Sequence, residues 1–372
     1  MKNIAWITAD YFLDFDIPLL KELAKQYQIE WYVLFPVNIN VDKEYFLKYG
    51  IQHNIEIVIV PLPKRQISIA NVLIYLKMFW RLKKKNPSII YFNLVGFPYF
   101  HLLAYIILNK GKKIIHAAHN VIDYKGWQYR KLMKLYTSFV FSFYKNIHLF
   151  SEYLESYFNK KYKNKNTLFT PLALTEYGES QKYPEGNRIK LLFFGNVKSN
   201  KRLDVLIKAI QQLGDELTNR VHLTIVGQCN NPDQYLNLIY KPDLFSINFI
   251  RLHSSEVADL FCSNHYLVLP YENVAQSGPH MIAYSYNIPV IASDIEGFRE
   301  RIKDNENGFL FKVNDVIDLQ RVLKNVIESH DDNYKRIKSN LSMFAKENYS
   351  IERIAQKYKK YFDKIINENE KV

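Results

Sequence analysis

Short apolar runs alternate with stretches of helical periodicity along most of the first half of the chain. An apolar run bounded by turn residues predicts a strand, and apolar residues three or four positions apart predict a helix. The predicted strands cover 3–8, 29–35, 55–60, 88–92, 112–117, 147–150 and 167–170, and the predicted helices cover 17–27, 69–85, 97–108, 127–145 and 152–158. Such alternation is typical of a parallel sheet with helices on both faces, so we predict an α/β fold.

The second half of the chain repeats this alternation. Its predicted strands cover 189–194, 221–226, 247–252, 266–269 and 289–293, and its predicted helices cover 203–213, 232–239, 256–262 and 317–326. Residues 171–187 contain Pro, Gly and Ser without a periodic apolar face, which is typical of a linker. Because 372 residues exceed the usual size of one core, we predict two domains, at 1–170 and 188–349, with a final helix in 350–372 that returns to the first.

The positive charge is concentrated in the first half of the chain. Lys and Arg outnumber Asp and Glu by 25 to 14 over residues 1–185 but only by 25 to 23 over the rest, and the net charge is +13. A basic surface of this kind favours an anionic membrane, an anionic substrate or nucleic acid. The chain has no Lys/Arg-rich tail and no familiar nucleic-acid module, so we expect no nucleic-acid partner.

One predicted helix, over 69–85, combines aromatic residues with a basic face. The basic residues are Lys77, Arg81, Lys83, Lys84 and Lys85. This pattern fits a helix at a membrane interface, and it also fits a crossover helix with a solvated basic end. No apolar run reaches the length of a bilayer-spanning helix, and acidic residues lie where a signal peptide would be apolar. We therefore expect a cytoplasmic protein, with peripheral contact at the inner face of an anionic membrane as an open alternative.

Two familiar kinds of site are missing from the sequence. The two cysteines, Cys229 and Cys262, lack the spacing of a metal site, so we expect no metal ligands. No Gly-x-Gly triplet occurs, which argues against a dinucleotide fingerprint and against a Walker loop.

Residues 188–213 predict a strand, a loop and a helix, in that order. Gly195 ends the strand, and the loop carries Lys198 and Lys201. Free backbone N–H groups and the dipole at a helix start add to the lysine charges, so this arrangement forms a candidate anion site. The alternative is an ordinary crossover with solvated lysines.

A second stretch with this chemistry begins at Pro270 and reads PYENVAQSGPHMIAYSYNIPVIASDIEGFRE. Pro279 suits the first turn of a helix, which places Ser277, Gly278 and His280 at the helix start. Their backbone N–H groups form a second candidate anion site. We predict a loop at 294–298, after the strand over 289–293.

Two histidines lie near the end of the predicted strand over 112–117. His119 follows that strand at the carboxyl edge, where open parallel sheets bind ligands. His116 lies inside the strand and is more typical of a core residue. His119 is therefore a candidate functional residue, with a purely structural role as the alternative.

Three segments within residues 188–312 carry a resemblance, namely FFGNVKSNKRLDVLIKAI, LTIVG and LVLPYENVAQSGPHMIAYSYNIPVIASDIEGFRERIKDNENGFLF. In their order and spacing they resemble the family 4 glycosyltransferases of the GT-B fold. The resemblance implies two Rossmann-like domains facing a cleft, with a nucleotide-sugar donor in the second and a glycan or lipid-linked acceptor in the first. It also implies sugar transfer to an acceptor hydroxyl with retention of configuration, in surface polysaccharide or glycoconjugate assembly. Neither a metal ion nor a cofactor beyond the nucleotide-sugar is expected.

The same resemblance assigns roles to individual residues. Lys198 and Lys201 would stabilise the departing diphosphate, and His119 would contact the reacting sugar. The donor-binding residues that it implies are Gly195, Asn196, Ser277, Gly278, Pro279, His280, Gly297 and Glu300.

The sequence departs from the family pattern at three positions. Asn196 stands where the family carries an arginine, and Val274 and Ile282 stand where it carries two glutamates. The second glutamate normally binds the ribose, and losing such a charged hydrogen bond costs roughly 1.5 to 3 kcal/mol. Glu272 could replace the first if the loop is displaced. These departures favour one alternative to an active enzyme, a glycosyltransferase-like binding or scaffold protein without catalysis. A third interpretation is another GT-B enzyme, such as an epimerase or a phosphorylase.

Overall fold

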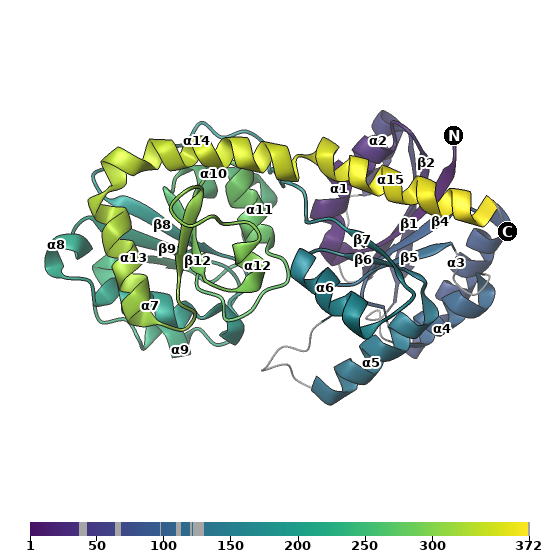
Figure 1. The fold of residues 1–372 in the computed structure, drawn as a ribbon, viewed down its shortest axis with the longest axis horizontal. Coiled ribbons are helices and arrows are strands. Elements are labelled where there is room, and N and C mark those ends of the chain that lie inside the picture. The colour runs from purple at the N-terminus through teal and green to yellow at the C-terminus, as the bar shows by residue number, and fades with distance from the viewer. Residues whose placement is uncertain are drawn as a thin grey trace. The chain divides into compact units, whose positions relative to one another are not determined.

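The computed structural model describes residues 1–36, 43–63, 68–96, 98–108, 113–119, 121 and 130–370. The chain forms two compact units, Met1–Ala173 with Ile351–Val372, and Leu174–Ser350 (Figure 1). Each unit is built on a parallel sheet with helices, which confirms the predicted α/β class. Helix α15 (Ile351–Glu370) returns the chain to the first unit.

The sheet of the first unit has seven strands within the described residues, all parallel, in the order β3-β2-β1-β4-β5-β6-β7. Their bounds are β1 Asn3–Ala9, β2 Gln28–Pro36, β3 Ile55–Leu62, β4 Ile89–Asn93, β5 Ile114–Ala117, β6 Asn146–Leu149 and β7 Asn166–Phe169. The strand order reverses between β1 and β4. Ligands bind at such a reversal in open parallel sheets, outside the carboxyl ends of the strands.

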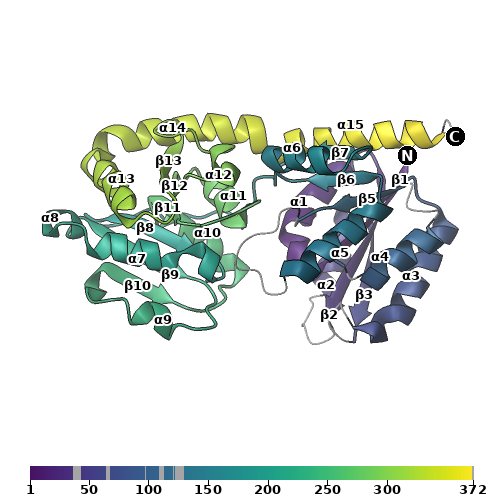
Figure 2. The same cartoon turned by 60° about the horizontal axis from the view of Figure 1, so that its bottom comes forward.

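Helices cover both faces of this sheet. They are α1 (Leu13–Leu23), α2 (Lys43–His53), α3 (Val72–Lys85), α4 (Pro98–Ile107), α5 (Arg130–Phe143), α6 (Glu152–Lys161) and α15. Two adjacent residues of β4 contact helices on opposite faces of the sheet. Tyr91 packs on Tyr358 of α15, whereas Phe92 packs on Phe79 of α3 and on Phe100 of α4. Successive side chains of a strand point to opposite faces, so α15 lies on one face and α3 and α4 on the other (Figure 2).

The sheet of the second unit has six parallel strands, in the order β10-β9-β8-β11-β12-β13. Their bounds are β8 Ile189–Phe194, β9 Val221–Val226, β10 Phe245–Asn248, β11 Tyr266–Leu269, β12 Val290–Ser293 and β13 Gly308–Phe311. The helices are α7 (Leu203–Gln211), α8 (Asp215–Thr218), α9 (Asp233–Leu236), α10 (Ser254–Cys262), α11 (Gly278–Ser285), α12 (Glu296–Arg299), α13 (Val316–Glu328) and α14 (His330–Tyr349). Here the strand order reverses between β8 and β11.

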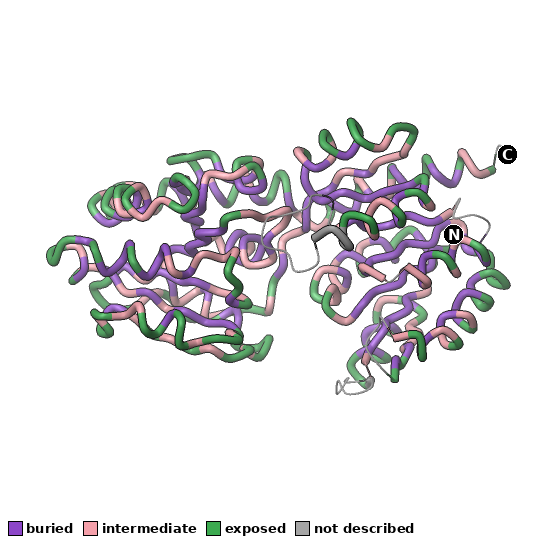
Figure 3. Tube along the Cα trace, turned by 90° about the horizontal axis from the view of Figure 1, so that it is seen from below, coloured by how far each residue is buried: buried purple, intermediate pink, exposed green. Residues whose placement is uncertain are grey.

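The strands form the core of each unit, and most of their residues are buried (Figure 3). Strands β1, β4 and β11 are apolar over most of their length because helices exclude water from both faces of a parallel sheet.

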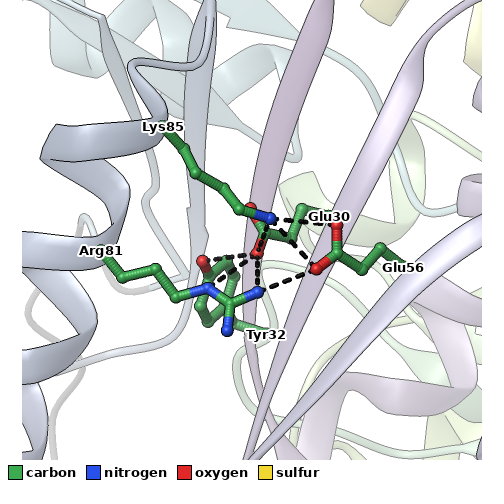
Figure 4. Close-up of polar contacts among 5 residues, drawn as sticks. All are labelled: Glu30, Tyr32, Glu56, Arg81 and Lys85. Atoms are coloured by element: carbon green, nitrogen blue, oxygen red, sulfur yellow. Dashed lines mark hydrogen bonds and ion pairs between the residues drawn. The ribbon is translucent and has the colours of Figure 1, made fainter.

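A cluster of charged side chains fastens α3 to the sheet of the first unit (Figure 4). Arg81 Nη2 lies 2.7 Å from Glu30 Oε1 and 2.8 Å from Glu56 Oε1. Lys85 Nζ lies 2.8 Å from Glu30 Oε1 and 3.0 Å from Glu56 Oε2. The Tyr32 hydroxyl also donates to Glu30. Two of the five basic residues on this predicted basic face are therefore paired within the protein.

Several boundaries differ from the prediction. Helix α1 begins at Leu13 rather than at residue 17, and β3 continues through Pro61 to Leu62. A proline is tolerated there because β3 is an edge strand, where a residue can lack a ladder N–H group. Residues 294–298, predicted as a loop, include part of helix α12. The sequence pattern did not indicate α2 or α14.

The strand predicted over 247–252 is β10, which starts two residues earlier and covers Phe245–Asn248. The helix predicted over 232–239 is shorter in the structure, where α9 covers Asp233–Leu236. The predicted helix over 127–145 begins outside the described residues, and its described part is α5. Within the described ranges, no helix has both the length and the apolar character needed to cross a bilayer.

Candidate functional site

The carboxyl end of β8 and the start of α11 lie against each other in the second unit. Gly195 follows β8 with a positive φ of 114°, and its N–H donates to Val226 O of the neighbouring strand. A Cβ atom at Gly195 would lie only 3.4 Å from Pro279 Cγ in the first turn of α11. The structure therefore brings the two predicted anion sites to one edge of the sheet.

The two lysines of the first loop occupy different environments. Residues Ser199–Lys201 form a single 3-10 turn, in which the Lys201 N–H donates to Lys198 O. Lys198 is exposed, whereas Lys201 is half-buried with its Nζ 3.5 Å from the centre of the Tyr271 ring. Burial, together with the charge of Lys198, lowers the pKa of Lys201 to about 7. The ring face attracts the ammonium group and holds it in place.

The segment after β11 is tied to the lysine loop. The Glu272 N–H donates to Asn200 O, at 2.9 Å, and Asn200 Nδ2 donates to Asn273 Oδ1. Glu272 is exposed, and its charge contributes to the raised pKa of Arg202, although the pairing of Arg202 with Asp204 contributes more. The exposed Glu272 carboxylate thus belongs to the same edge as Lys198 and Lys201.

The start of α11 offers backbone donors. The Ser277 side chain caps the helix by accepting from the His280 N–H, and Pro279 has no N–H to offer. The N–H groups of Ser277 and Gly278 are therefore the ones that this helix start presents to an anion.

The His280 side chain packs into the core of the second unit. Its ring is fully buried, with its centre 4.2 Å from the Tyr284 ring and 5.7 Å from the Phe298 ring. Neither ring nitrogen has a hydrogen-bond partner among the described residues. Burial, with a smaller contribution from Arg301, holds the pKa of His280 well below its usual value. In this structure the imidazole packs as part of the core.

Helix α12 packs against the loop after β11 at Gly297. A Cβ atom at Gly297 would collide with the Val274 carbonyl oxygen, so only glycine fits in this part of α12. Glu300 lies 3.5 Å from the buried guanidinium of Arg301, which donates to Gly297 O. Ile282, at the second glutamate position, is buried.

In the first unit, His119 is enclosed by aromatic rings. Phe12 stacks on one side at 3.8 Å between ring centres, and Phe150 stacks at 4.7 Å. His119 Nε2 lies 2.7 Å from Asn93 Oδ1. Burial, with a smaller effect of His148, lowers the pKa of His119 to about 3. His119 is therefore neutral near pH 7.

Asn93 is hydrogen-bonded to a buried carboxylate. Asp16 of α1 accepts hydrogen bonds from Trp6 Nε1, from the Thr8 hydroxyl and from Asn93 Nδ2. Burial raises the pKa of Asp16 to about 6, although these three hydrogen bonds oppose the increase. Asp16, Asn93 and His119 follow or end β1, β4 and β5, and so they meet at the reversal of strand order in the first unit.

The second unit matches a known family over most of its length. Residues 178–342 match the model described as glycosyl transferases group 1. We call this matched segment the group 1 domain. The protein is also 28% identical over 195 residues to the uncharacterized glycosyltransferase MJ1069 of Methanocaldococcus jannaschii. That alignment covers 51% of this chain and 49% of the relative, so the match spans about half the length of each.

Solved structures share the fold of the whole chain. HepE of Anabaena in complex with UDP and glucose matches with a TM-score of 0.72 at 15% identity, over 98% of this chain and 100% of HepE. Sucrose-phosphate synthase of Thermosynechococcus elongatus matches with a TM-score of 0.75 at 14% identity, over 99% of this chain and 100% of the synthase. The two α/β units are therefore the Rossmann-like domains of the GT-B glycosyltransferase fold.

Within the group 1 domain, the expected donor residues gather around two strand ends. Gly195, exposed Asn196 and the two lysines follow β8, whereas Glu272 follows β11. The start of α11 and the close packing of Gly297 against Val274 O complete the group, and Glu300 lies beside Arg301 in the same unit. In the other unit, His116 is buried in β5, which confirms its interpretation as a core histidine.

Sequence reasoning missed Asp16 and Asn93. One signal was available, since Asp16 lies on the apolar face of α1, followed at helical spacing by Leu19, Leu20 and Leu23. An acid in such a position is unusual unless it is paired. Among the described residues, no group of three His, Cys, Asp or Glu side chains is arranged to hold a metal ion.

Proposed function

We propose that this protein transfers a sugar from a nucleotide-sugar donor to an acceptor hydroxyl. The observation that carries the proposal is the shared edge of the group 1 domain, where Lys198 and Lys201 lie beside Gly195 and the start of α11. Two ammonium groups and helix-start N–H groups suit the charge of a diphosphate. HepE, which shares the fold, was solved with UDP and with UDP-glucose, and this supports a nucleotide-sugar as the donor.

In this proposal the group 1 domain stabilises the leaving group. As the bond between sugar and diphosphate breaks, negative charge grows on the diphosphate, next to the lysines and the Ser277 and Gly278 N–H groups. Lys201 would bind a proton as the donor arrives, because an adjacent diphosphate favours the charged ammonium. Protein groups alone would supply this positive charge, without a metal ion or a further cofactor. Retention of configuration rests on the resemblance to family 4.

We assign the acceptor to the first unit. Neutral His119 would orient a hydroxyl of the sugar, and a phosphate oxygen of the donor would accept the proton of the acceptor hydroxyl. The acceptor that we propose is a glycan or a lipid-linked glycan in surface polysaccharide or glycoconjugate assembly.

A surface of the first unit supports a lipid-linked acceptor. Helices α3, α4 and α5 contact one another in sequence order and expose apolar side chains, namely Leu73, Trp80, Leu102, Ile106, Leu135 and Phe139. Exposed Lys77, Lys84 and Lys134 lie on the same helices. We call these residues the α3–α5 surface. Apolar and basic groups together fit the inner face of an anionic membrane, which we propose as its occupant.

The lysine pair provides the direct test of the activity. Replacing both Lys198 and Lys201 with alanine should abolish transfer and donor hydrolysis, measured by mass spectrometry with mixed UDP-, GDP- and dTDP-sugars. The matched control is Lys182→Ala, because Lys182 is exposed and outside this edge. Unchanged turnover in the double variant would contradict the mechanism.

One observation favours a second candidate. Val274 and the buried Ile282 at the glutamate positions are compatible with a glycosyltransferase-like binding or scaffold protein. Calorimetry with the same nucleotide-sugars separates the candidates, because a folded protein that binds none of them would favour the scaffold.

A further inference from the structure

A chain of buried side chains crosses the first unit at the reversal of strand order. Trp31 Nε1 lies 2.9 Å from Thr8 Oγ1, and Thr8 in turn contacts Asp16 Oδ2. On the other side of the carboxylate, Asn93 Nδ2 lies 2.8 Å from Asp16 Oδ1, and His119 Nε2 lies 2.7 Å from Asn93 Oδ1. Trp6 Nε1 also contacts Asp16 Oδ2, at 2.9 Å.

The chemistry of these groups fixes the direction of every hydrogen bond. An indole N–H can only donate, so Trp31 donates to Thr8 Oγ1 and leaves the hydroxyl proton of Thr8 for Asp16. An ionised carboxylate can only accept, so the NH₂ group of Asn93 must face Asp16. The amide oxygen of Asn93 then faces His119, and this oxygen can only accept a hydrogen bond.

The hydrogen bond between Asn93 and His119 therefore determines which ring nitrogen of His119 carries the proton. A neutral imidazole carries one proton, and the Asn93 oxygen requires it on Nε2. The rings of Phe12 and Phe150, at 16° and 20° to the imidazole plane, hold the ring between them. In this tautomer the lone pair lies on Nδ1, which is then the hydrogen-bond acceptor of the ring.

We propose that Asp16 and Asn93 are positioning residues that hold His119 as its Nε2–H tautomer. This inference rests on the proposed sugar transfer for its catalytic meaning. The state of the proton on His119 is a property of the protein alone, and it can be measured without any substrate.

A single substitution should reverse the direction of the hydrogen bonds between position 16, Asn93 and His119. In Asp16→Asn, the amide oxygen at position 16 still accepts from Trp6 and Thr8, and its NH₂ group then faces Asn93. Asn93 must turn its oxygen toward position 16 and its NH₂ group toward His119. The imidazole then has to accept at Nε2 and carry its proton on Nδ1, which is the opposite tautomer.

A second substitution should restore the original direction. In the double variant Asp16→Asn with Asn93→Asp, the new amide at position 16 donates to one oxygen of the new carboxylate. The other oxygen again accepts from His119 Nε2–H. The double variant keeps the size and the shape of both side chains, so it controls for packing.

The experiment uses the full-length protein, labelled with nitrogen-15 in histidine, at pH 7.5. The NMR shifts of His119 should report Nε2–H in the wild type, Nδ1–H in Asp16→Asn and Nε2–H again in the double variant. For transfer, we expect kcat to fall about 100-fold in Asp16→Asn with the donor KM nearly unchanged, and to recover in the double variant. Thermal melting of all three proteins checks that each is folded.

The outcomes separate the inference from the proposed function. An unchanged tautomer in folded Asp16→Asn would overturn the inference. A reversed tautomer with wild-type kcat would overturn the positioning role of Asp16 and Asn93. Absence of transfer by the wild type would contradict the proposed function. The NMR result would still decide whether Asp16 and Asn93 determine which ring nitrogen of His119 carries the proton.

Discussion

At the scale of single residues, the candidate functional residues include ionisable groups whose burial disfavours their charged form. Burial lowers the pKa of Lys201 to about 7 and raises that of Asp16 to about 6. Each shift favours the neutral form of its group in the folded protein. Perturbed groups of this kind are typical of functional sites.

The pKa of Lys201 predicts how donor binding depends on pH. Above pH 7 the free protein increasingly carries neutral Lys201, and a diphosphate must then bind together with a proton. We expect the affinity for UDP to fall by up to about tenfold per pH unit between pH 7 and 9. Isothermal titration in buffers of different ionisation enthalpy should show proton uptake.

The control variant for this effect is Lys201→Arg, since a guanidinium remains charged throughout this range. Its UDP affinity should vary little from pH 7 to 9. An equally steep fall in Lys201→Arg would assign the pH dependence to another group.

At the scale of elements, short contacts between neighbouring segments build the candidate anion site. The carboxyl ends of β8 and β11 are adjacent because these strands pair, and this brings the lysine loop to the segment around Glu272. Gly297 packs against Val274 O so closely that a side chain would not fit, and this contact holds that segment against α12. Helix α3 shows the opposite case, because Glu30 and Glu56 neutralise Arg81 and Lys85 and leave fewer charges for a partner.

The α3–α5 surface predicts membrane binding that depends on both lipid charge and apolar contact. We expect the protein to sediment with vesicles that contain phosphatidylglycerol and not with pure phosphatidylcholine vesicles. The double variant Ile106→Glu with Leu135→Glu should lower the partition coefficient at least about tenfold, because each exposed apolar side chain contributes 1 kcal/mol or more when buried in lipid.

Ile317→Glu is the matched control, since Ile317 is equally exposed but lies on α13 of the second unit. It should bind vesicles like the wild type. Loss of binding in the control, or its persistence in the double variant, would contradict the assignment of this surface.

At the scale of the whole molecule, buried histidines are concentrated in the first unit. Four of them have pKa values lowered mainly by burial, to about 4 for His101, to about 3 for His119 and His148, and well below the usual value for His116. Each folded value lies below the unfolded value near 6.5. The stability that these histidines contribute is therefore complete above pH 6.5 and is lost as the pH falls toward the folded values.

We expect the first unit to lose stability steeply on mild acidification. His101, His119 and His148 should each remove about 2 kcal/mol of unfolding free energy between pH 6.5 and 5, and His116 acts in the same direction. Asp16 acts with the opposite sign, because its raised pKa makes its contribution fall as the pH rises through about 6, but it is one group against four.

Fluorescence gives a readout of the first unit alone, since all four tryptophans precede residue 174 in the sequence. Urea unfolding followed by tryptophan fluorescence should show a much lower midpoint at pH 5 than at pH 7. Equal midpoints would contradict the expectation.

The sequence by itself determined much of the architecture. Apolar periodicity is a local property, so it indicated nearly every strand of both sheets and the α/β class, while the chain length and the composition of residues 171–187 indicated two units. It failed where local signals are weak, as for α2 and for the polar helix α14. The candidate anion sites at Gly195, the lysines and Ser277–Gly278–Pro279 were also predicted from local pattern, because such sites use backbone turns that short sequences encode.

Only the tertiary structure decided which distant side chains meet. Asp16 and Asn93 are 77 positions apart, and nothing local links them to His119. They meet because parallel strands β1, β4 and β5 end at one edge of the sheet, which is a consequence of strand order. The same holds for Lys201 on Tyr271 and for Arg81 between two glutamates. Helix and strand formation depends on neighbours in sequence, whereas the proton on His119 depends on neighbours in space.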